Sequence, residues 1–366
     1  MYPYEKIIDA EYASMVNFEN LLLCYNLVKG SNPNSRDCYE FSINLYANLN
    51  QLLYELLTFT YNPLPPVEKE IFDIKYRIIS APRFRDRIVQ RLLAIYIQDD
   101  VNDKLLLPNT YACIKNRGTF RALNHAIYIV KNCNFVLNGD IHHYFNSICT
   151  DIMLKILASI IRDPNVFWLA SKFVPNLPNS IIIGSVTSQI YANIYLHMLD
   201  NFVVNDLKTP NYVRYMDDFV IGLNDYNKAC SLITILSDFL FNNLRLTLKP
   251  TTNIINTNIF PYKFLGYTIY KNGSTFIRDS IVKDLIKEIV YYKYHGYSYE
   301  ELFRNRLLYV LNALYFIKDF NAYNYIISLL YHYNIQSPIL DRPTKEEKDF
   351  DKEFGVYMKS FFKKYM

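Results

Sequence analysis

The chain has 366 residues, of which 51% are hydrophobic, and its formal net charge is +4. This composition excludes an acidic disordered protein and a low-complexity chain, and so small a charge does not by itself indicate a nucleic-acid-binding protein. The six cysteines show no C-x-x-C spacing and no apolar run reaches the about 18 residues that span a bilayer, so we expect a cytoplasmic protein with no disulfide scaffold, zinc ribbon or membrane segment.

The first part of the chain is predicted to be helical. Apolar residues recur at three- and four-residue spacings over residues 11–60, which is the pattern of amphipathic helices. The proline-rich segment 62–66 ends this region, because proline cannot continue a helix and the residue before it favours extended backbone. Alternation over residues 67–81 then predicts a pair of strands, and residues 86–101 fit an amphipathic helix.

Short strands and helices are mixed from residue 134 onward. NFVLNGD predicts a strand that ends at Asp140, and GSVTSQIYANIYLHMLDNFV predicts a loop that enters a long helix. NYVRYMDDFVIGL predicts two strands around an acidic turn, and PYKFLGYTIYKNGSTFI a second hairpin with Asn272-Gly273 in its turn. Residues 280–364 are predicted to be helical, with polar breaks near His295 and Asp319. This order favours an α+β fold over a doubly wound α/β fold.

Two adjacent carboxylates, Asp217 and Asp218, lie at the turn of the first predicted hairpin. At a tight turn two side chains can project toward one point, where carboxylates repel each other unless a cation or a proton lies between them. Mg²⁺ is the usual partner of an all-oxygen site, and Asp140 is the obvious third ligand. Aspartates at the ends of neighbouring strands can hold two Mg²⁺ ions about 4 Å apart, the arrangement used in phosphoryl transfer.

An ordinary solvated acidic turn is the alternative interpretation of this pair. The same dipeptide occurs at Asp99-Asp100, at the end of a predicted helix, where we assign no function. The apolar runs on both sides of Asp217-Asp218 favour metal binding, because uncompensated charge is costly in such a setting.

The segment RYMDDFVIG resembles the signature hairpin of reverse transcriptases, and other segments over about residues 60–270 resemble further motifs of that family in the same order. These segments are IFDIKYRIISAPRFRDRIVQRLL of the fingers, PNTYACIKNRGTFRALNHA between fingers and palm, FVLNGDIHHYFNSI of the first catalytic palm motif, IGSVTSQIYANIYLHMLD of the following loop and helix, and FLGYTI of the primer-gripping strand. The resemblance implies an α+β right-hand polymerase. The implied regions are 1–66, an N-terminal helical region; 67–136, the fingers; 137–279, the palm with a fingers insertion at about 160–183; and 280–366, the helical thumb and C-terminal extension.

The resemblance also implies the reaction and its partners. The chain would copy a noncoding RNA template into cDNA from deoxynucleotides, with two Mg²⁺ ions. The segment IGSVTSQ is similar to the enzymes of bacterial and phage diversity-generating retroelements, which implies an error-prone enzyme with a structured RNA and a small accessory protein as partners. The alternative is an antiphage defence reverse transcriptase that makes repetitive or protein-primed DNA. A non-catalytic RNA-binding scaffold is disfavoured by the intact aspartates.

The same resemblance implies a role for individual residues. Asp140, Asp217 and Asp218 would be the catalytic metal ligands, with the backbone carbonyl of Ile141. The residues implied to bind the nucleotide are Lys75, Arg77, Phe145, Ile183, Gly184 and Gln189. The residues implied to contact primer or template are Arg83, Arg87, Tyr215, Met216, Phe264, Leu265 and Gly266.

Four of these positions, and one segment outside this set, carry alternatives or departures from the family pattern. Phe145 would exclude a 2′-hydroxyl, with an ordinary core residue as the alternative, and Ile183 stands where relatives have a polar glutamine. Arg83 and Arg87 belong to a basic stretch, residues 74–91, with six basic residues and one acidic residue. Relatives commonly place a lysine in the segment that here reads LTLKPTT; either Lys249 reaches inward or the role is absent.

Overall fold

The computed structural model describes residues 5–31, 33, 35–72, 76–175, 181, 184–295 and 300–332. The chain divides into two compact units, Met1–Phe260 and Pro261–Met366. Helices and antiparallel strands are mixed in the order expected, so the predicted α+β class is confirmed. The bounds of the N-terminal region, fingers, palm and thumb stay predictions. Within the described ranges no helix is both long and apolar enough to cross a bilayer.

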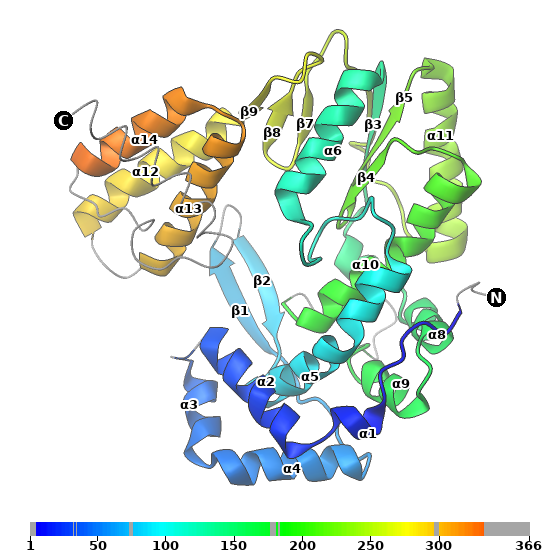
Figure 1. The fold of residues 1–366 in the computed structure, drawn as a ribbon, viewed down its shortest axis with the longest axis vertical. Coiled ribbons are helices and arrows are strands. Elements are labelled where there is room, and N and C mark those ends of the chain that lie inside the picture. The colour runs from blue at the N-terminus through cyan, green and yellow to red at the C-terminus, as the bar shows by residue number, and fades with distance from the viewer. Residues whose placement is uncertain are drawn as a thin grey trace. The chain divides into compact units, whose positions relative to one another are not determined.

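Helices form the N-terminal part of the first unit, as the apolar spacing predicts (Figure 1). They are α1 (Tyr12–Met15), α2 (Phe18–Ser31), α3 (Arg36–Ile43) and α4 (Leu45–Leu57). Helices α2 and α3 pack against α5 (Phe84–Asp100), whose apolar side chains, such as Leu92, are fully buried. The proline-rich segment separates α4 from the antiparallel pair β1 (Val67–Phe72) and β2 (Tyr76–Ala81), which is also as predicted.

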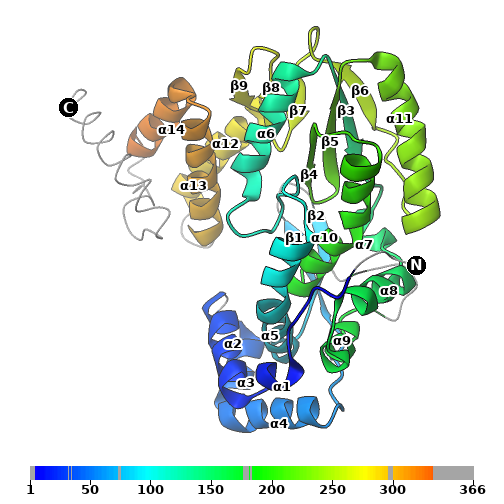
Figure 2. The same cartoon turned by 45° about the vertical axis from the view of Figure 1, so that its right-hand side comes forward.

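A four-stranded antiparallel sheet follows, in the order β4-β5-β3-β6. Its strands are β3 (Phe135–Asp140), β4 (Tyr212–Tyr215), β5 (Asp218–Leu223) and β6 (Asn253–Asn256). Helices α6 (Gly118–Asn132) and α11 (Tyr226–Phe239) pack on the sheet in both views (Figures 1 and 2). The four middle residues of β5 are all buried, because β5 lies between two strands and beneath helices. The predicted strand at Asp140 and the predicted hairpin around Asp217 are confirmed.

Two glycines allow close approaches that set the geometry of this sheet. The ring of Phe219 lies directly over Gly139, where an added Cβ would stand 2.1 Å from the ring. Gly222 similarly faces Ile129 of α6 and Cys133, the residue after that helix, with an added Cβ only 2.5 Å from the nearest of their atoms. A larger residue at Gly139 would therefore displace the backbone next to Asp140.

Helix α10 links the sheet to the N-terminal helices. The helices between β3 and β4 in the sequence are α7 (Tyr144–Ser147), α8 (Thr150–Ile160), α9 (Pro164–Ser171) and α10 (Val186–Asn201). Buried residues lie on nearly all sides of α10, which packs against α5 and α8. Helices α5, α10 and α11 each continue into a short π-helical turn, at Val101–Leu105, Phe202–Asp206 and Leu240–Leu244. One hydrophobic core runs through the unit from Ile8 to Leu246.

The second unit contains a three-stranded antiparallel sheet and three helices. They are β7 (Tyr262–Phe264), β8 (Tyr267–Ile269), β9 (Thr275–Ile277), α12 (Asp279–His295), α13 (Glu300–Phe316) and α14 (Phe320–His332). The predicted turn at Asn272-Gly273 joins β8 to β9, and the helix break near Asp319 is confirmed. The predicted break near His295 falls on residues 296–299, which lie outside the described residues. The predicted two-stranded hairpin is corrected: Leu265-Gly266 forms a second tight turn, which adds β7 as a third strand.

Candidate active site

The register of the central sheet brings the three predicted aspartates together. Asp140, the last residue of β3, lies directly opposite Asp218, the first residue of β5. Asp218 also pairs with Tyr215 of β4, so that Met216 and Asp217 form the two-residue turn between β4 and β5. Asp140 and Asp218, 78 positions apart in the sequence, thus meet at one end of the sheet.

The turn is held in an uncommon backbone conformation. Met216 has a φ of +57°, a left-handed value that costs free energy for a residue with a side chain. The carbonyl oxygen of Met216 accepts a hydrogen bond of 3.0 Å from Nη1 of the buried Arg214. The hydroxyl groups of Tyr215 and Thr119 share a hydrogen bond of 3.1 Å, which ties the end of β4 to α6. Contacts on both sides therefore fix the turn that carries Asp217.

Burial and mutual repulsion raise the pKa values of two of the three aspartates, Asp217 and Asp218. Burial, and then the charges of Asp140 and Asp217, raises the pKa of Asp218 to about 7. The pKa of Asp217 is raised as well, by burial first and by Asp140, although Lys249 and Arg214 act in the opposite direction. Such mutual repulsion is relieved by a bound proton or by a cation.

Lys249 supplies one positive charge to this cluster, and sequence reasoning left it outside the set of site residues. Its Nζ donates a short hydrogen bond to Oδ2 of Asp140, and its backbone N–H donates to the carbonyl of Asp140 at 2.8 Å. Partial burial lowers the pKa of Lys249, but the hydrogen bond and charge of Asp140 outweigh it and the pKa is raised. Of the two alternatives for the LTLKPTT segment, the structure supports the inward-reaching Lys249.

The backbone around Ile141 also points toward the cluster. Ile141 bridges to Leu248, and the flanking hydrogen bonds run from Lys249 N–H to the Asp140 carbonyl and from His142 N–H to the Thr247 carbonyl. In an antiparallel pair this pattern leaves the central residue's own N–H and C=O directed to the opposite side. The opposite side of β3 is the one on which β5 and Asp218 lie, as the predicted role of the Ile141 carbonyl requires.

The residues present fit a magnesium site that is completed by other molecules. Oδ1 of Asp140 is buried and accepts no hydrogen bond from any residue that the structure describes. Within those residues no three His, Cys, Asp or Glu side chains form a ready-made metal cage. Mg²⁺ is usually held in another way, by one or two carboxylates together with waters and substrate phosphates. Asp140, Asp217, Asp218 and the Ile141 carbonyl are oxygen donors of the kind that it prefers.

Arg214 and Asp200 form a fully buried ion pair beneath the turn. Nε and Nη2 of Arg214 donate to the two carboxylate oxygens of Asp200, at 2.7 and 2.6 Å. Tyr212 and Thr110 donate to the same two oxygens, at 2.7 and 3.0 Å. Burial by itself would raise the pKa of Asp200, but the charge and hydrogen bonds of Arg214 hold it below the ordinary value.

This ion pair connects α10 to the turn that carries Asp217. Nη1 of Arg214 donates both to Asn193 Oδ1 on α10, at 3.1 Å, and to the Met216 carbonyl. Asp200 is itself the penultimate residue of α10. Sequence reasoning assigned no role to Arg214 or Asp200, because charges in an amphipathic pattern are usually solvated and only their burial shows otherwise.

The residues predicted to bind the nucleotide lie in different parts of the structure. Phe145 is half-buried in α7, whereas its neighbour Tyr144 is buried and donates a hydrogen bond to the Ala192 carbonyl. Gly184 is exposed with a φ of +105°, and Gln189 is exposed in the first turns of α10. Lys75 and Ile183 lie outside the described residues. Arg77 lies in β2, where it pairs with Ile71 of β1, and only the backbone of Arg77 is described.

The basic stretch around Arg83 and Arg87 is partly neutralised within the fold. Arg85 forms an ion pair of 2.5 Å with Glu55 of α4, and Arg87 one of 3.2 Å with Asp37 of α3. Nε of Arg83 donates to the Pro65 carbonyl at 3.3 Å. The count of basic residues in this stretch overstates its free positive charge, because the acidic partners Glu55 and Asp37 come from helices that precede it in the sequence.

The predicted primer-gripping residues lie in the second unit. Phe264 is buried and stacks on Tyr262, with ring centroids 6.1 Å apart. Leu265 and Gly266 form the β7–β8 turn with φ values of +48° and +89°, a pair typical of a tight hairpin turn. Contact of these residues with a primer stays a prediction.

Comparisons with known proteins agree with this geometry. Residues 67–269 match the family model described as reverse transcriptase (RNA-dependent DNA polymerase). The chain is 25% identical over 342 residues to an uncharacterized 91 kDa protein in the cob intron of Schizosaccharomyces pombe, covering 72% of this chain and 42% of that protein. It is 22% identical over 307 residues to the group II intron-encoded protein LtrA of Lactococcus lactis subsp. cremoris, covering 63% of this chain and 51% of that protein.

A solved structure of telomerase from Candida albicans in complex with a fragment of telomeric RNA matches with a TM-score of 0.45 and 13% identity, covering 75% of this chain and 58% of that chain. The chain spans about two fifths to one half of the length of the two curated relatives. The family model does not distinguish a retroelement from a defence subtype. The family match covers the central sheet and its aspartates, and confirms the predicted polymerase fold: the chain belongs to the reverse transcriptase family.

Proposed function

We propose that the protein is an RNA-directed DNA polymerase, which adds deoxynucleotides to a primer 3′-hydroxyl along an RNA template. The observation that carries this proposal is the register that sets Asp140 opposite Asp218, with Asp217 in the adjoining turn. Carboxylates that meet in this way, with one buried oxygen lacking a described partner, suit divalent metal ions better than a structural role.

Asp140, Asp217, Asp218 and the Ile141 carbonyl would hold two Mg²⁺ ions. When bound, such ions lower the pKa of the attacking hydroxyl and neutralise charge on the triphosphate. The protein's own contribution is positional: β3 and β5 fix the carboxylates, and Arg214 holds the turn. The Lys249 ammonium adds positive charge beside Asp140 and donates a hydrogen bond to its carboxylate.

Primer extension tests the proposal. The purified protein should extend a DNA primer annealed to an RNA template when Mg²⁺ and deoxynucleotides are present, and chelation of the metal should stop it. A chain that binds RNA but never extends a primer, with Mg²⁺ or with Mn²⁺, would instead be a non-catalytic scaffold.

Phe145 is proposed to exclude ribonucleotides. The Phe145 ring is half-buried and can face a ligand, whereas the neighbouring Tyr144 ring is buried in the core and held by its hydrogen bond to the Ala192 carbonyl. Phe145→Ala should raise the incorporation of ribonucleotides relative to deoxynucleotides by about 10-fold or more, because removal of the ring opens room for a 2′-hydroxyl. Competition between the two nucleotide types in single-turnover extension measures this. Unchanged sugar selectivity in the variant would assign Phe145 to packing.

Ile183 is proposed to lower fidelity. An aliphatic side chain cannot donate or accept the hydrogen bonds of the glutamine found in relatives, so correct and incorrect pairs are discriminated less. Ile183→Gln should reduce misincorporation, most clearly opposite template adenine. Sequencing of the products of wild-type and variant enzyme on one template measures the error spectrum, and identical spectra would remove the proposed role of Ile183.

The RNA partner defines the biological role. The loop segment IGSVTSQ favours a diversity-generating retroelement, with a structured noncoding RNA and an accessory protein as partners. The relatives are named as intron-encoded proteins, which favours an intron RNA as a second candidate template. Sequencing of the RNA that co-purifies with the protein, and of the DNA made from it, separates these roles; repetitive DNA covalently joined to the protein would indicate the defence role instead.

A further inference from the structure

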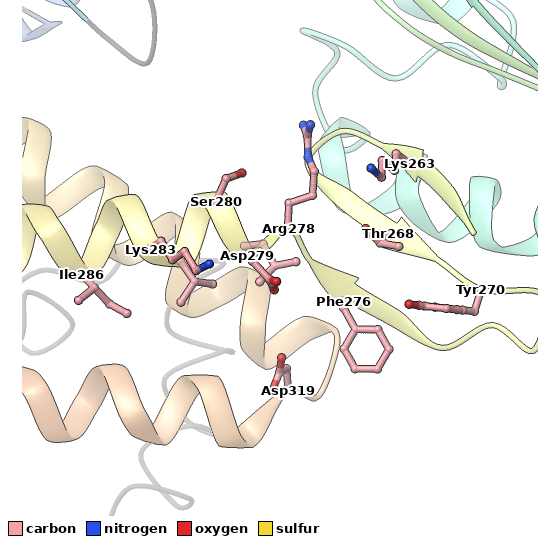
Figure 3. Close-up of a pocket in the computed structure, with 12 residues that line it drawn as sticks. Lys263, Thr268, Tyr270, Phe276, Arg278, Asp279, Ser280, Lys283, Ile286 and Asp319 are labelled. Atoms are coloured by element: carbon pink, nitrogen blue, oxygen red, sulfur yellow. The ribbon is translucent and has the colours of Figure 1, made fainter. Parts of the chain in front are cut away.

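The sheet of the second unit presents one face that is not part of its core. Across β7, β8 and β9, Lys263 pairs with Thr268 and Thr268 with Phe276, so these three side chains lie on the same face (Figure 3). The alternate residues Tyr262, Phe264, Tyr267, Ile269 and Ile277 are buried on the other face. The first face is therefore built from residues that the fold of this unit does not need for its core.

This face forms one wall of a cavity of about 780 Å³, which the start of α12 and Asp319 complete. Two aromatic rings stand in it largely exposed: Tyr270, with 43% of its surface accessible, and Phe276, with 48%. Their centroids are 5.8 Å apart and the rings are perpendicular. Exposed aromatic rings in a cavity of this size offer stacking surfaces for planar groups.

Three basic side chains line the same cavity as the rings. Lys263, Arg278 and Lys283 line the cavity and are exposed, and none forms an ion pair with a residue in the described part of the chain. Figure 3 shows Lys263 on the sheet, Arg278 at the end of β9 and Lys283 on α12, whereas Asp279 and Asp319 lie nearer Phe276. The cavity thus combines a basic edge, two stacking rings and carboxylates that can accept hydrogen bonds from amino groups.

We propose that this cavity binds single-stranded RNA, with phosphates along Lys263, Arg278 and Lys283 and unpaired bases against Tyr270 and Phe276. Recognition of unpaired bases by aromatic rings on an open sheet, beside basic side chains, is a general mode of single-strand binding. Asp279 and Asp319 would accept hydrogen bonds from base amino groups. The inference rests on the proposed function, because that function makes RNA the macromolecule that the protein must hold.

Direct binding tests the inference without requiring polymerisation. The probe is a fluorescein-labelled unstructured RNA of about ten nucleotides, a length within the range of single-strand sites. Tyr270→Ala/Phe276→Ala should weaken binding between about 5-fold and 100-fold, the loss expected for one or two stacked bases. Arg278→Ala/Lys283→Ala should also reduce the slope of log affinity against log salt, by about 0.7 for each phosphate that the protein no longer neutralises.

Matched substitutions elsewhere control for general effects on the surface. Phe241→Ala removes a ring that is 65% exposed, and Arg36→Ala a side chain that is 92% exposed; both should bind the RNA as the wild type does. Duplex RNA should compete poorly, because paired bases cannot reach the rings. RNA that carries 4-thiouridine should crosslink to the segment 263–283.

The inference is overturned if both double variants bind with the affinity and salt slope of the controls, if duplex RNA competes equally, or if crosslinks lie outside that segment. Its failure would leave the proposed polymerase untouched, since primer extension is measured separately. Absence of primer extension in the wild type would be a failure of the proposed function instead.

Discussion

Asp217→Asn is expected to abolish DNA synthesis while leaving the fold and RNA binding intact. The amide keeps the shape of the side chain but removes the charge that holds a divalent cation in the turn between β4 and β5. Loss of metal-ion stabilisation is worth several kilocalories per mole in the transition state, so the extension rate should fall by about a thousandfold or more. Single-turnover primer extension with saturating Mg²⁺ measures the loss.

The chain offers a matched control for this substitution. Asp99→Asn removes one charge from the other Asp-Asp dipeptide, at the exposed end of α5, and should extend primers at the wild-type rate. Equal losses in both variants would mean that the effect follows from net charge. Near-normal extension by Asp217→Asn would remove the proposed active site altogether.

Arg214→Met is expected to have the largest effect on stability. The substitution leaves the Asp200 carboxylate buried without its ion-pair partner, although Tyr212 and Thr110 still donate to it. Breaking one side of a buried pair typically costs about 3–5 kcal/mol of the free energy of unfolding. Urea unfolding followed by circular dichroism measures the change. Arg162→Met breaks the exposed pair with Asp9 and should cost less than about 1 kcal/mol.

A double variant separates packing from positioning. Arg214→Met/Asp200→Leu replaces both charges by apolar groups and should regain much of the stability, because buried ion pairs are often matched by hydrophobic residues. DNA synthesis should stay impaired, since the Met216 carbonyl still lacks its donor and the strained turn has lost this support. Recovery of both stability and activity would show that Arg214 acts only through the fold.

Local sequence patterns predicted much of what positions the site. The apolar runs on each side of Asp217-Asp218 specified β4, β5 and their turn, and the run before Asp140 specified β3. The hairpin and the strand β3 are each predicted from residues adjacent in the sequence, and period-two alternation with a short acidic turn is a strong local signal. Its place at the end of that run made Asp140 the candidate third ligand, and the resemblance to reverse transcriptases implied the same role.

The interactions that sequence reasoning missed are the long-range ones. Lys249 reaches Asp140 because residues 247–249 form a bridge beside the end of β3, a contact across 109 positions that no local pattern specifies. Arg214 and Asp200 belong to a strand and a helix whose charged residues resemble solvated ones until tertiary packing buries both. The strand β7 was missed because its turn at Leu265-Gly266 lacks the usual turn residue at its first position.

The most direct test of the metal site counts bound ions. Mn²⁺ is titrated into the protein with primer, template and a non-hydrolysable deoxynucleotide, and free Mn²⁺ is followed by electron paramagnetic resonance. Wild type and Asp99→Asn should bind the same number of ions per chain, and Asp140→Asn should bind fewer and more weakly. Equal Mn²⁺ binding by all three proteins would contradict a shared cation site at Asp140, Asp217 and Asp218.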